Sequence, residues 1–316
     1  MKIVCLDGKA LNPGDLSWAP IEALGDFTVY DQTDTEDQAI VRLQGAEALL
    51  VNKFSVTETL LAACPTIRLV CVLATGYNVV DCAAARKRGI PVCNVPCYGT
   101  AAVAQFTLGL MLTLCHRIEY HSQSVHAGDW TACPDFCYWL TPQMELAGKT
   151  LGILGFGRIG QAVAKLGKAF GMDVITCSRT RRETDLAEFV SFEELLRRSD
   201  FLTLHCPLTA ENTGILNRET IAGMKNGAML INTARGALVD EQALADALAS
   251  GKLAGAAVDV ACQEPIHAQN PLLTAPNCII TPHIAWAPLE SRVRLMNVVA
   301  DNIRAFQDGK PQNVVN

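Results

Sequence analysis

The chain has 316 residues, half of them apolar and 18% charged, and its formal net charge is −6. This length exceeds what one small core requires, so one large or two medium domains are expected. The acidic balance, without a long run of Lys and Arg, argues against a nucleic-acid partner and favours a small molecule.

The first hundred residues alternate short apolar runs with helical patterns. Strands are expected at residues 3–6, 27–30, 48–51, 68–73 and 91–95. Helices are expected near residues 18–24, 36–43, 57–63 and 81–88. Strands that alternate with helices in this way predict a parallel sheet with helices on both faces.

Residues 99–127 are expected to form one long helix. The segment is apolar on most of its circumference, so we expect it to be buried between domains or subunits. Residues 128–148 follow as a turn-rich stretch. This stretch carries the large aromatic side chains Trp130, Phe136, Tyr138 and Trp139. Such a cluster fits either a plug in the core or an interface arm, and the sequence leaves both open.

A second alternation of strands and helices begins at Thr150 and continues to about Ile280. The last helical pattern, residues 288–306, is expected to return to the first domain. The sequence therefore predicts an α/β protein with two doubly wound parallel-sheet domains. One domain would comprise residues 1–98 and 287–316, and the other residues 99–286.

The thirteen cysteines are scattered through apolar segments and form no Cys-x-x-Cys pair, so they are interpreted as small buried side chains. No metal site is predicted. The N-terminal stretch begins as a strand and lacks the pattern of a signal peptide. The longest apolar stretch, residues 101–115, is shorter than a membrane span and contains polar side chains. No membrane partner and a cytoplasmic location are expected.

Gly155, Gly157 and Gly160 form a Gly-x-Gly-x-x-Gly pattern. A strand-like run precedes them, a helical pattern at residues 159–170 follows, and the next strand is expected at 173–177. Gly155 is expected to make the turn, Gly157 to let amides approach a pyrophosphate, and Gly160 to let helix and strand pack closely. Because the N–H groups at a helix N-terminus favour phosphate, a dinucleotide site is predicted.

The residues after the next strand indicate which dinucleotide binds. NAD-binding proteins usually place Asp or Glu there, about 20 residues beyond the glycines. Here Ser178 occupies that place, and Arg179, Thr180, Arg181 and Arg182 follow. A hydroxyl and several guanidinium groups suit a 2′-phosphate, so NADP is favoured over NAD. The alternative is that the arginines only solvate the loop and NAD binds without the carboxylate.

Three candidate reacting groups, Arg235, Glu264 and His283, each follow a strand-like run. Because parallel strands end at one edge of a doubly wound sheet, these side chains are expected to meet beside the dinucleotide. The three fit the reduction of a 2-oxo acid. His283 would supply the proton, and Glu264 would orient the ring and stabilise the imidazolium. Arg235 would bind the substrate carboxylate and polarise the carbonyl.

With these residues assembled, the chain resembles the D-isomer-specific 2-hydroxyacid dehydrogenase family nearly from end to end. The matching motifs are Gly-Phe-Gly-Arg-Ile-Gly at 155–160, Leu-His-Cys-Pro-Leu-Thr at 204–209, Asn-Thr-Ala-Arg-Gly at 232–236 and Thr-Pro-His at 281–283. The resemblance implies a Rossmann cofactor domain at residues 99–286 and a flavodoxin-like substrate domain in the remainder. It also implies a homodimer built on the cofactor domains.

The resemblance further implies roles for individual residues. It makes Arg235, Glu264 and His283 catalytic. Cofactor contacts are expected at Arg158, Ile159, Ser178, Cys206, Pro207, Asn212, Thr233, Arg235, Asp259 and His283. Substrate contacts are expected at Lys53, Ala74, Thr75, Gly76, Arg235 and His283.

Within the family, residues 283–287 and 136–139 are similar to those of members that act on glycerate and hydroxypyruvate. We therefore expect reduction of small 2-oxo acids, foremost hydroxypyruvate and glyoxylate, to D-glycerate and glycolate, with NADPH or NADH. Two alternatives stay open: a reductase of bulkier 2-oxo acids, and a nucleotide-sensing binding protein like the corepressors of this fold. Ala261 departs from the family pattern, which commonly has an aromatic there.

Overall fold

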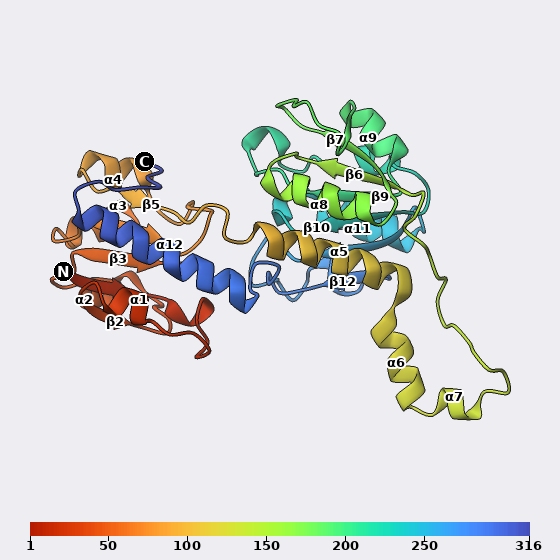
Figure 1. Ribbon diagram of the computed structural model, residues 1–316, viewed down its shortest axis with the longest axis horizontal. Helices are drawn as coiled ribbons and strands as arrows, with labels where there is room; N and C mark the ends of the chain where they lie inside the picture. The colour runs from red at the N-terminus through yellow and green to blue at the C-terminus, as the bar shows by residue number, and fades with distance from the viewer. The chain divides into compact units, whose positions relative to one another are not determined.

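The computed structural model describes all 316 residues, and they form two compact units. Unit 1 comprises Met1–Gly99 and Ala287–Asn316, and unit 2 comprises Thr100–Trp286. Each unit contains one sheet, and every pairing between its named strands is parallel (Figure 1). The expected α/β class with two doubly wound sheets is confirmed.

The sheet of unit 1 has five strands in the order β2-β1-β3-β4-β5, which is the flavodoxin-like order. Its strands are β1 (Lys2–Cys5), β2 (Asp26–Val29), β3 (Ala48–Val51), β4 (Leu69–Val72) and β5 (Val92–Cys93). Its helices are α1 (Ala19–Glu22), α2 (Glu36–Arg42), α3 (Glu58–Ala63), α4 (Cys82–Lys87) and α12 (Leu289–Gln307), with a 3₁₀ turn at Gly8–Ala10.

Helices cover both faces of this sheet. Buried side chains of α2, α3 and α4 form one cluster with alternate residues of β1, β3 and β4. α12 packs against β4 beside α1. Threonine and aspartate side chains cap three of these helices: Thr35, Thr57 and Asp81 each accept a hydrogen bond from a backbone N–H in the first turn. The caps fix where each helix leaves its strand.

The sheet of unit 2 has seven strands in the order β12-β11-β10-β9-β6-β7-β8, which is the Rossmann order extended by one strand. Its strands are β6 (Thr150–Leu154), β7 (Asp173–Cys177), β8 (Glu188–Phe189), β9 (Phe201–Leu204), β10 (Ala228–Asn232), β11 (Leu253–Val258) and β12 (Cys278–Ile280). Its helices are α5 (Thr100–His116), α6 (Ile118–His126), α7 (Asp129–Ala132), α8 (Arg158–Ala169), α9 (Phe192–Arg198), α10 (Arg218–Ala222) and α11 (Glu241–Ala249). Three 3₁₀ turns lie at Ala210–Asn212, Gly236–Leu238 and Pro271–Leu273.

Two hydrophobic clusters enclose this sheet. One joins the sheet to α5 and α8, and the other joins it to α9, α10 and α11. The carboxyl ends of the strands are left for the loops that carry the candidate site, as is usual for doubly wound sheets.

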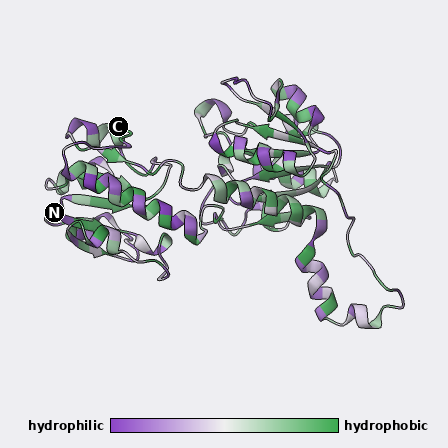
Figure 2. Ribbon diagram, in the orientation of Figure 1, coloured by the Kyte–Doolittle hydropathy of each residue, from purple (hydrophilic) through white to green (hydrophobic).

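The single helix expected over residues 99–127 is wrong. α5 ends at His116, Arg117 has a φ of 47°, and α6 then continues at a bend of 53°. The reason lies in what each part contacts. α5 packs against α8 and β11, whereas most α6 side chains meet solvent. Figure 2 shows the change from a largely hydrophobic α5 to a more hydrophilic α6.

By length and hydropathy, no single helix in the chain would cross a membrane, and only the bent pair of α5 and α6, taken together, passes that test.

α6, α7 and the first part of the loop that follows leave the body of unit 2 as an extended arm (Figure 1), and the loop returns to the core at Met144 and Leu146. Trp130, Phe136 and Trp139 are 50%, 89% and 69% exposed on this arm. The interpretation of the aromatic segment as a core plug is therefore wrong. Its interpretation as an interface stays a prediction.

Candidate active site

The glycine turn follows β6 at the point where the strand order of unit 2 reverses, between β6 and β9. Gly155 has a φ of 98°, and a Cβ atom there would lie 2.6 Å from the backbone nitrogen of Cys206. A Cβ atom on Gly160 would overlap the carbonyl oxygen of Gly155. The turn therefore requires glycine at both places, because neither backbone has room for a side chain.

The N-terminus of α8 opens toward free space. Gly157 is its N-cap, and the first hydrogen bond of the helix runs from Gln161 N to Gly157 O at 3.0 Å. The N–H groups of residues 158–160 precede that bond. A Cβ atom on Gly157 would meet nothing within 4 Å. Amides without an acceptor inside the helix, with open space beside Gly157, fit a pyrophosphate.

The loops after β7 and β9 bring cofactor candidates from two sides. Ser178 and Arg179 follow β7, and Cys206 and Asn212 follow β9. Asn212 Nδ2 donates to the carbonyl of Pro207 at 2.8 Å, which fixes the turn.

Arg179 supplies positive charge between these two loops. The pKa of Glu211 is lowered, first by a hydrogen bond from Thr209 and more weakly by the Arg179 guanidinium. Burial raises the pKa of the Cys206 thiol, and the same guanidinium opposes this weakly. The exposed guanidinium of Arg179 in the loop after β7 suits an anionic ligand.

His205 presents an unpaired nitrogen next to the glycine turn. Its Nε2 atom is enclosed and has no hydrogen-bond partner. Burial lowers the pKa of the ring to about 3, so the imidazole is neutral at physiological pH. Enclosed polar atoms are normally paired in folded proteins, so this unpaired nitrogen is an exception.

The three candidate reacting groups follow three adjacent strands. Arg235 follows β10, Glu264 follows β11 and His283 follows β12. His283 Nδ1 and Glu264 Oε2 are 2.7 Å apart, and Glu264 Oε1 accepts the backbone N–H of Ala261 at 3.2 Å. With Nδ1 directed at the carboxylate, Nε2 is the ring nitrogen available to carry a proton to a substrate.

Asp259 holds the loop that carries His283. Its side chain accepts Thr281 Oγ1 at 2.6 Å, Ile284 N at 2.9 Å and Ala285 N at 2.8 Å, and the residue is only 1% exposed. His283 itself has a φ of 56°. A cofactor contact was expected of Asp259. The structure shows that its carboxylate fixes the loop that carries the imidazole, and the cofactor contact stays a prediction.

Arg235 lies in a turn that its neighbours restrain. Its guanidinium Nη1 donates to the carbonyl of Ala234 at 2.6 Å, and its own carbonyl accepts Asn232 Nδ2 at 2.9 Å. Thr233 Oγ1 lies 3.1 Å from the buried Thr107 Oγ1 of α5. The guanidinium is exposed, so it can meet an anionic ligand.

The substrate-contact candidates of unit 1 follow two adjacent strands. Lys53 follows β3, and the loop Ala74, Thr75 and Gly76 follows β4. Thr75 Oγ1 donates to the carbonyl of Val95 at 2.7 Å, which ties this loop to the end of β5. The loop is therefore held by its side chain, and its backbone amides stay available.

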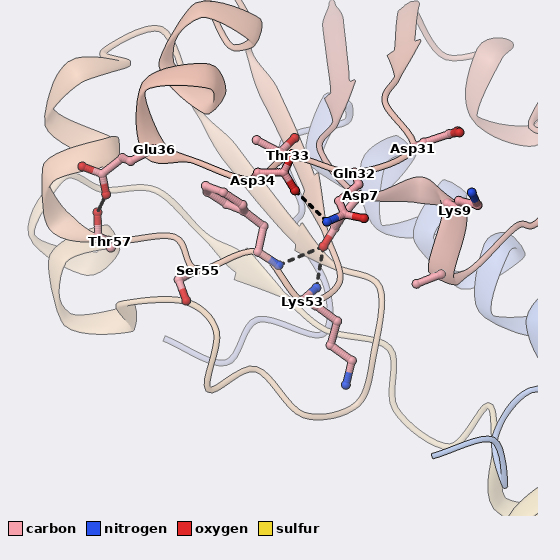
Figure 3. A pocket seen from close by; sticks show the side chains of 12 residues that line it. Asp7, Lys9, Asp31, Gln32, Thr33, Asp34, Glu36, Lys53, Ser55 and Thr57 are labelled. Atoms are coloured by element: carbon pink, nitrogen blue, oxygen red, sulfur yellow. Dashed lines mark hydrogen bonds between the residues drawn. The ribbon is translucent and has the colours of Figure 1, made fainter. Parts of the chain in front are cut away.

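Asp7 fixes the segment that carries Lys53, a contact that sequence reasoning missed. Its carboxylate accepts the backbone N–H groups of Asn52, Lys53 and Phe54 at 2.8, 2.6 and 2.8 Å. Asp7 and Lys53 line a pocket of about 700 Å³ in unit 1. Figure 3 shows the Lys53 side chain extending away from the Asp7 carboxylate.

Some of the residues that the sequence analysis did not single out carry a weak sequence signal. Asp7 follows a buried strand, and Thr107 interrupts an apolar helix. A polar residue in such a place signals a specific partner, but the partner is far away in the sequence. The structure contains no group of three or more His, Cys, Asp or Glu side chains placed to hold a metal ion.

The order of the strands, the glycine turn and the histidine–glutamate pair together define a dinucleotide-dependent oxidoreductase. Residues 108–285 match the family model described as D-isomer specific 2-hydroxyacid dehydrogenase, NAD binding domain. The chain belongs to this family and is an NAD(P)-dependent 2-hydroxyacid dehydrogenase. Hydride transfer between NAD(P)H and small 2-oxo acids is the reaction of the class, so the nucleotide-sensing alternative is set aside.

Two curated relatives are similar over the whole chain. A hydroxypyruvate reductase of Blautia hydrogenotrophica is 50% identical over 321 residues and covers 100% of both chains. A glycerate dehydrogenase of Methylorubrum extorquens is 40% identical and covers 99% of this chain and 98% of its own. Among solved structures, an acyclic imino acid reductase in complex with NADPH and D-Arg is 31% identical, with a TM-score of 0.88 and full coverage of both chains.

Proposed function

We propose that this dehydrogenase reduces hydroxypyruvate and glyoxylate and that NADPH is its favoured reductant. The observation that carries the proposal is the 2.7 Å contact between Glu264 and His283 on the strand ends of a dinucleotide-binding sheet. The relatives named hydroxypyruvate reductase and glycerate dehydrogenase support the substrate class.

Each reacting group has one task in this proposal. A nicotinamide cofactor held by unit 2 would supply the hydride that reduces the carbonyl carbon. His283 Nε2 delivers the proton to the carbonyl oxygen, and Glu264 holds the ring and stabilises its protonated form. Arg235 binds the substrate carboxylate with its fork of N–H donors.

Unit 1 would be the substrate domain in this proposal, and unit 2 would hold the cofactor. Lys53 and the amides of Ala74, Thr75 and Gly76 would contact the small acid. The pyrophosphate would be held by the glycine turn and the start of α8, which are Gly155, Gly157, Arg158, Ile159 and Gly160. The rest of the cofactor would contact Cys206, Pro207, Asn212, Thr233 and Asp259. Both the substrate contacts and the cofactor contacts follow strands that are neighbours in their sheet, which supports this division.

The preference for NADPH rests on the β7 loop. Ser178, Arg179 and Thr180 offer hydroxyl and guanidinium groups where a carboxylate would favour NADH. The imino acid reductase bound to NADPH shows that a protein of the same fold accepts this cofactor. NADH remains the alternative.

A turnover assay tests the assignment. Hydroxypyruvate, glyoxylate, pyruvate and a branched 2-oxo acid are compared with NADPH and NADH, each by its kcat/KM. The two small acids are expected to be the best substrates, with NADPH ahead of NADH. A branched acid with the highest kcat/KM would establish the reductase of bulkier acids instead. A clear advantage of NADH would refute the interpretation of the β7 loop.

The variant His283→Ala is expected to lose almost all turnover, by roughly a hundredfold or more, because general acid catalysis is removed. Cofactor binding, measured by the fluorescence of bound NADPH, is expected to stay within about threefold, since the glycine turn is untouched. Retained turnover would contradict the role of the imidazole.

We also propose that the protein is a homodimer in the cytoplasm. The exposed aromatic side chains of the arm support an interface with a second copy. The thirteen cysteines are free thiols, which fits a reducing compartment.

A further inference from the structure

The loop that carries Glu264 lies directly on the segment after β10. A Cβ atom on Gly236 would overlap the backbone of Ala261 and Cys262. This close approach brings the loop after β11 next to the turn that carries Arg235. The contact fixes how closely the loop after β11 packs on the segment after β10. Packing against a glycine does not, however, prevent the loop from moving sideways.

A side chain of α11 supplies the missing restraint. Glu241 is the first residue of that helix, after the N-cap Asp240. Its Oε1 atom accepts the backbone N–H of Cys262 at 2.9 Å. The thiol of Cys262 donates to the carbonyl of Val239 at 3.7 Å, just before the same helix. The loop is thus tied to the N-terminus of α11 through its backbone and through a side chain.

The hydrogen bond between Glu241 and Cys262 links α11 to the Glu264–His283 pair. Cys262 follows Ala261, whose N–H group is bound by Glu264 Oε1, and Glu264 Oε2 contacts His283. A shift of Cys262 would therefore displace the Glu264 carboxylate, which is the hydrogen-bond partner of the His283 imidazole. Because the histidine–glutamate distance is 2.7 Å, a displacement of about 1 Å would break the hydrogen bond.

We propose that Glu241 is a positioning residue: by binding the amide of Cys262 it holds Glu264 against His283. This inference rests on the proposed function only for its effect on turnover. Its structural part, the restraint of residues 261–264, can be measured without substrate.

The test compares Glu241→Ala with Glu241→Gln. Alanine removes the acceptor for the Cys262 amide, whereas glutamine keeps an oxygen acceptor and removes only the charge. Glu219→Ala is the matched control, because it removes an exposed glutamate from the first turn of a neighbouring helix, α10, and Glu219 is not the residue that binds the Cys262 amide. Thermal unfolding of each variant verifies that it is folded.

Two measurements separate positioning from a general loss of structure. Hydrogen–deuterium exchange of the free enzyme is followed in peptides that contain residues 260–264. Steady-state kinetics then give kcat and KM with hydroxypyruvate and NADPH. Glu241→Ala is expected to speed exchange in that segment and to lower kcat roughly ten- to hundredfold, with KM for NADPH within about threefold. Glu241→Gln is expected to restore most of both.

The outcomes distinguish the two proposals. Equal defects in Glu241→Ala and Glu241→Gln would overturn the inference, because the helix charge and not the acceptor would matter. Unchanged exchange and kcat in Glu241→Ala would overturn it as well. If the wild-type enzyme fails to reduce any of the small acids while Glu241→Ala still loosens residues 260–264, the proposed substrates are wrong and the restraint stands.

Discussion

Gly155 and Gly157 lie two residues apart, yet a methyl group would act differently at each. Gly155→Ala places a Cβ atom 2.6 Å from a backbone nitrogen at a φ of 98°, so a loss of about 1–3 kcal/mol in the free energy of unfolding is expected. Gly157→Ala meets no atom and should change stability by less than about 1 kcal/mol. It should nevertheless weaken NADPH binding, because the methyl group enters the space left for phosphate.

Urea unfolding and fluorescence titration with NADPH measure these two quantities separately. Gly109, in the middle of α5 and with open space beside it, provides the control Gly109→Ala. Unaltered NADPH affinity in Gly157→Ala would contradict the phosphate site at α8.

Ser178 is the residue at which the proposed cofactor preference can be tested. A carboxylate in Ser178→Asp would bond the ribose hydroxyls of NADH and repel a 2′-phosphate. The ratio of kcat/KM for NADPH to that for NADH should fall by roughly ten- to a hundredfold, as expected for charge-assisted hydrogen bonds of about 1.5–3 kcal/mol. Ser191→Asp adds the same charge at the N-cap of α9 and should leave the ratio unchanged. A constant ratio in Ser178→Asp would place the ribose elsewhere.

At the scale of elements, Asp7 joins the end of β1 to the segment after β3. Asp7→Ala would leave three backbone N–H groups without their acceptor in a site where Asp7 is 8% exposed. The free energy of unfolding is expected to fall by about 2–4 kcal/mol. Urea unfolding followed by circular dichroism measures the loss.

Asp31→Ala is the control for this change, since Asp31 lies in the same pocket after β2 and is exposed. It should alter the free energy of unfolding by less than about 1 kcal/mol. Equal stability of Asp7→Ala and Asp31→Ala would show that the N–H groups find other partners.

Most elements could be predicted from the sequence because their apolar periodicity is local. The strand at residues 48–51 and the helix from Leu289 agree closely with the expected ranges. The break at Arg117 could not be predicted, because the sequence remains compatible with a helix on both sides of it. The helix ends where packing on α8 and β11 ends, and those partners are distant in the chain.

At the scale of the whole molecule, the arm presents large aromatic side chains that are exposed in the single chain. The double substitution Phe136→Ser and Trp139→Ser is expected to raise the dissociation constant of a homodimer by roughly a hundredfold or more, because buried aromatic side chains dominate interface energies. Sedimentation equilibrium measures this constant. Phe170→Ser, a similar change at the end of α8, should leave it unaltered. A monomeric wild-type protein would contradict the proposal.

The sequence by itself determined the two-domain α/β class, the dinucleotide turn and the identity of the three candidate reacting side chains. These features depend on short-range patterns: apolar periodicity, glycine spacing and the position of polar residues after strands. Only the tertiary structure decided that Glu264 contacts His283, that Asp7 and Glu241 restrain their loops, and that the aromatic segment is exposed. Hydrogen bonds between distant segments depend on sheet order and loop height, which no local pattern encodes.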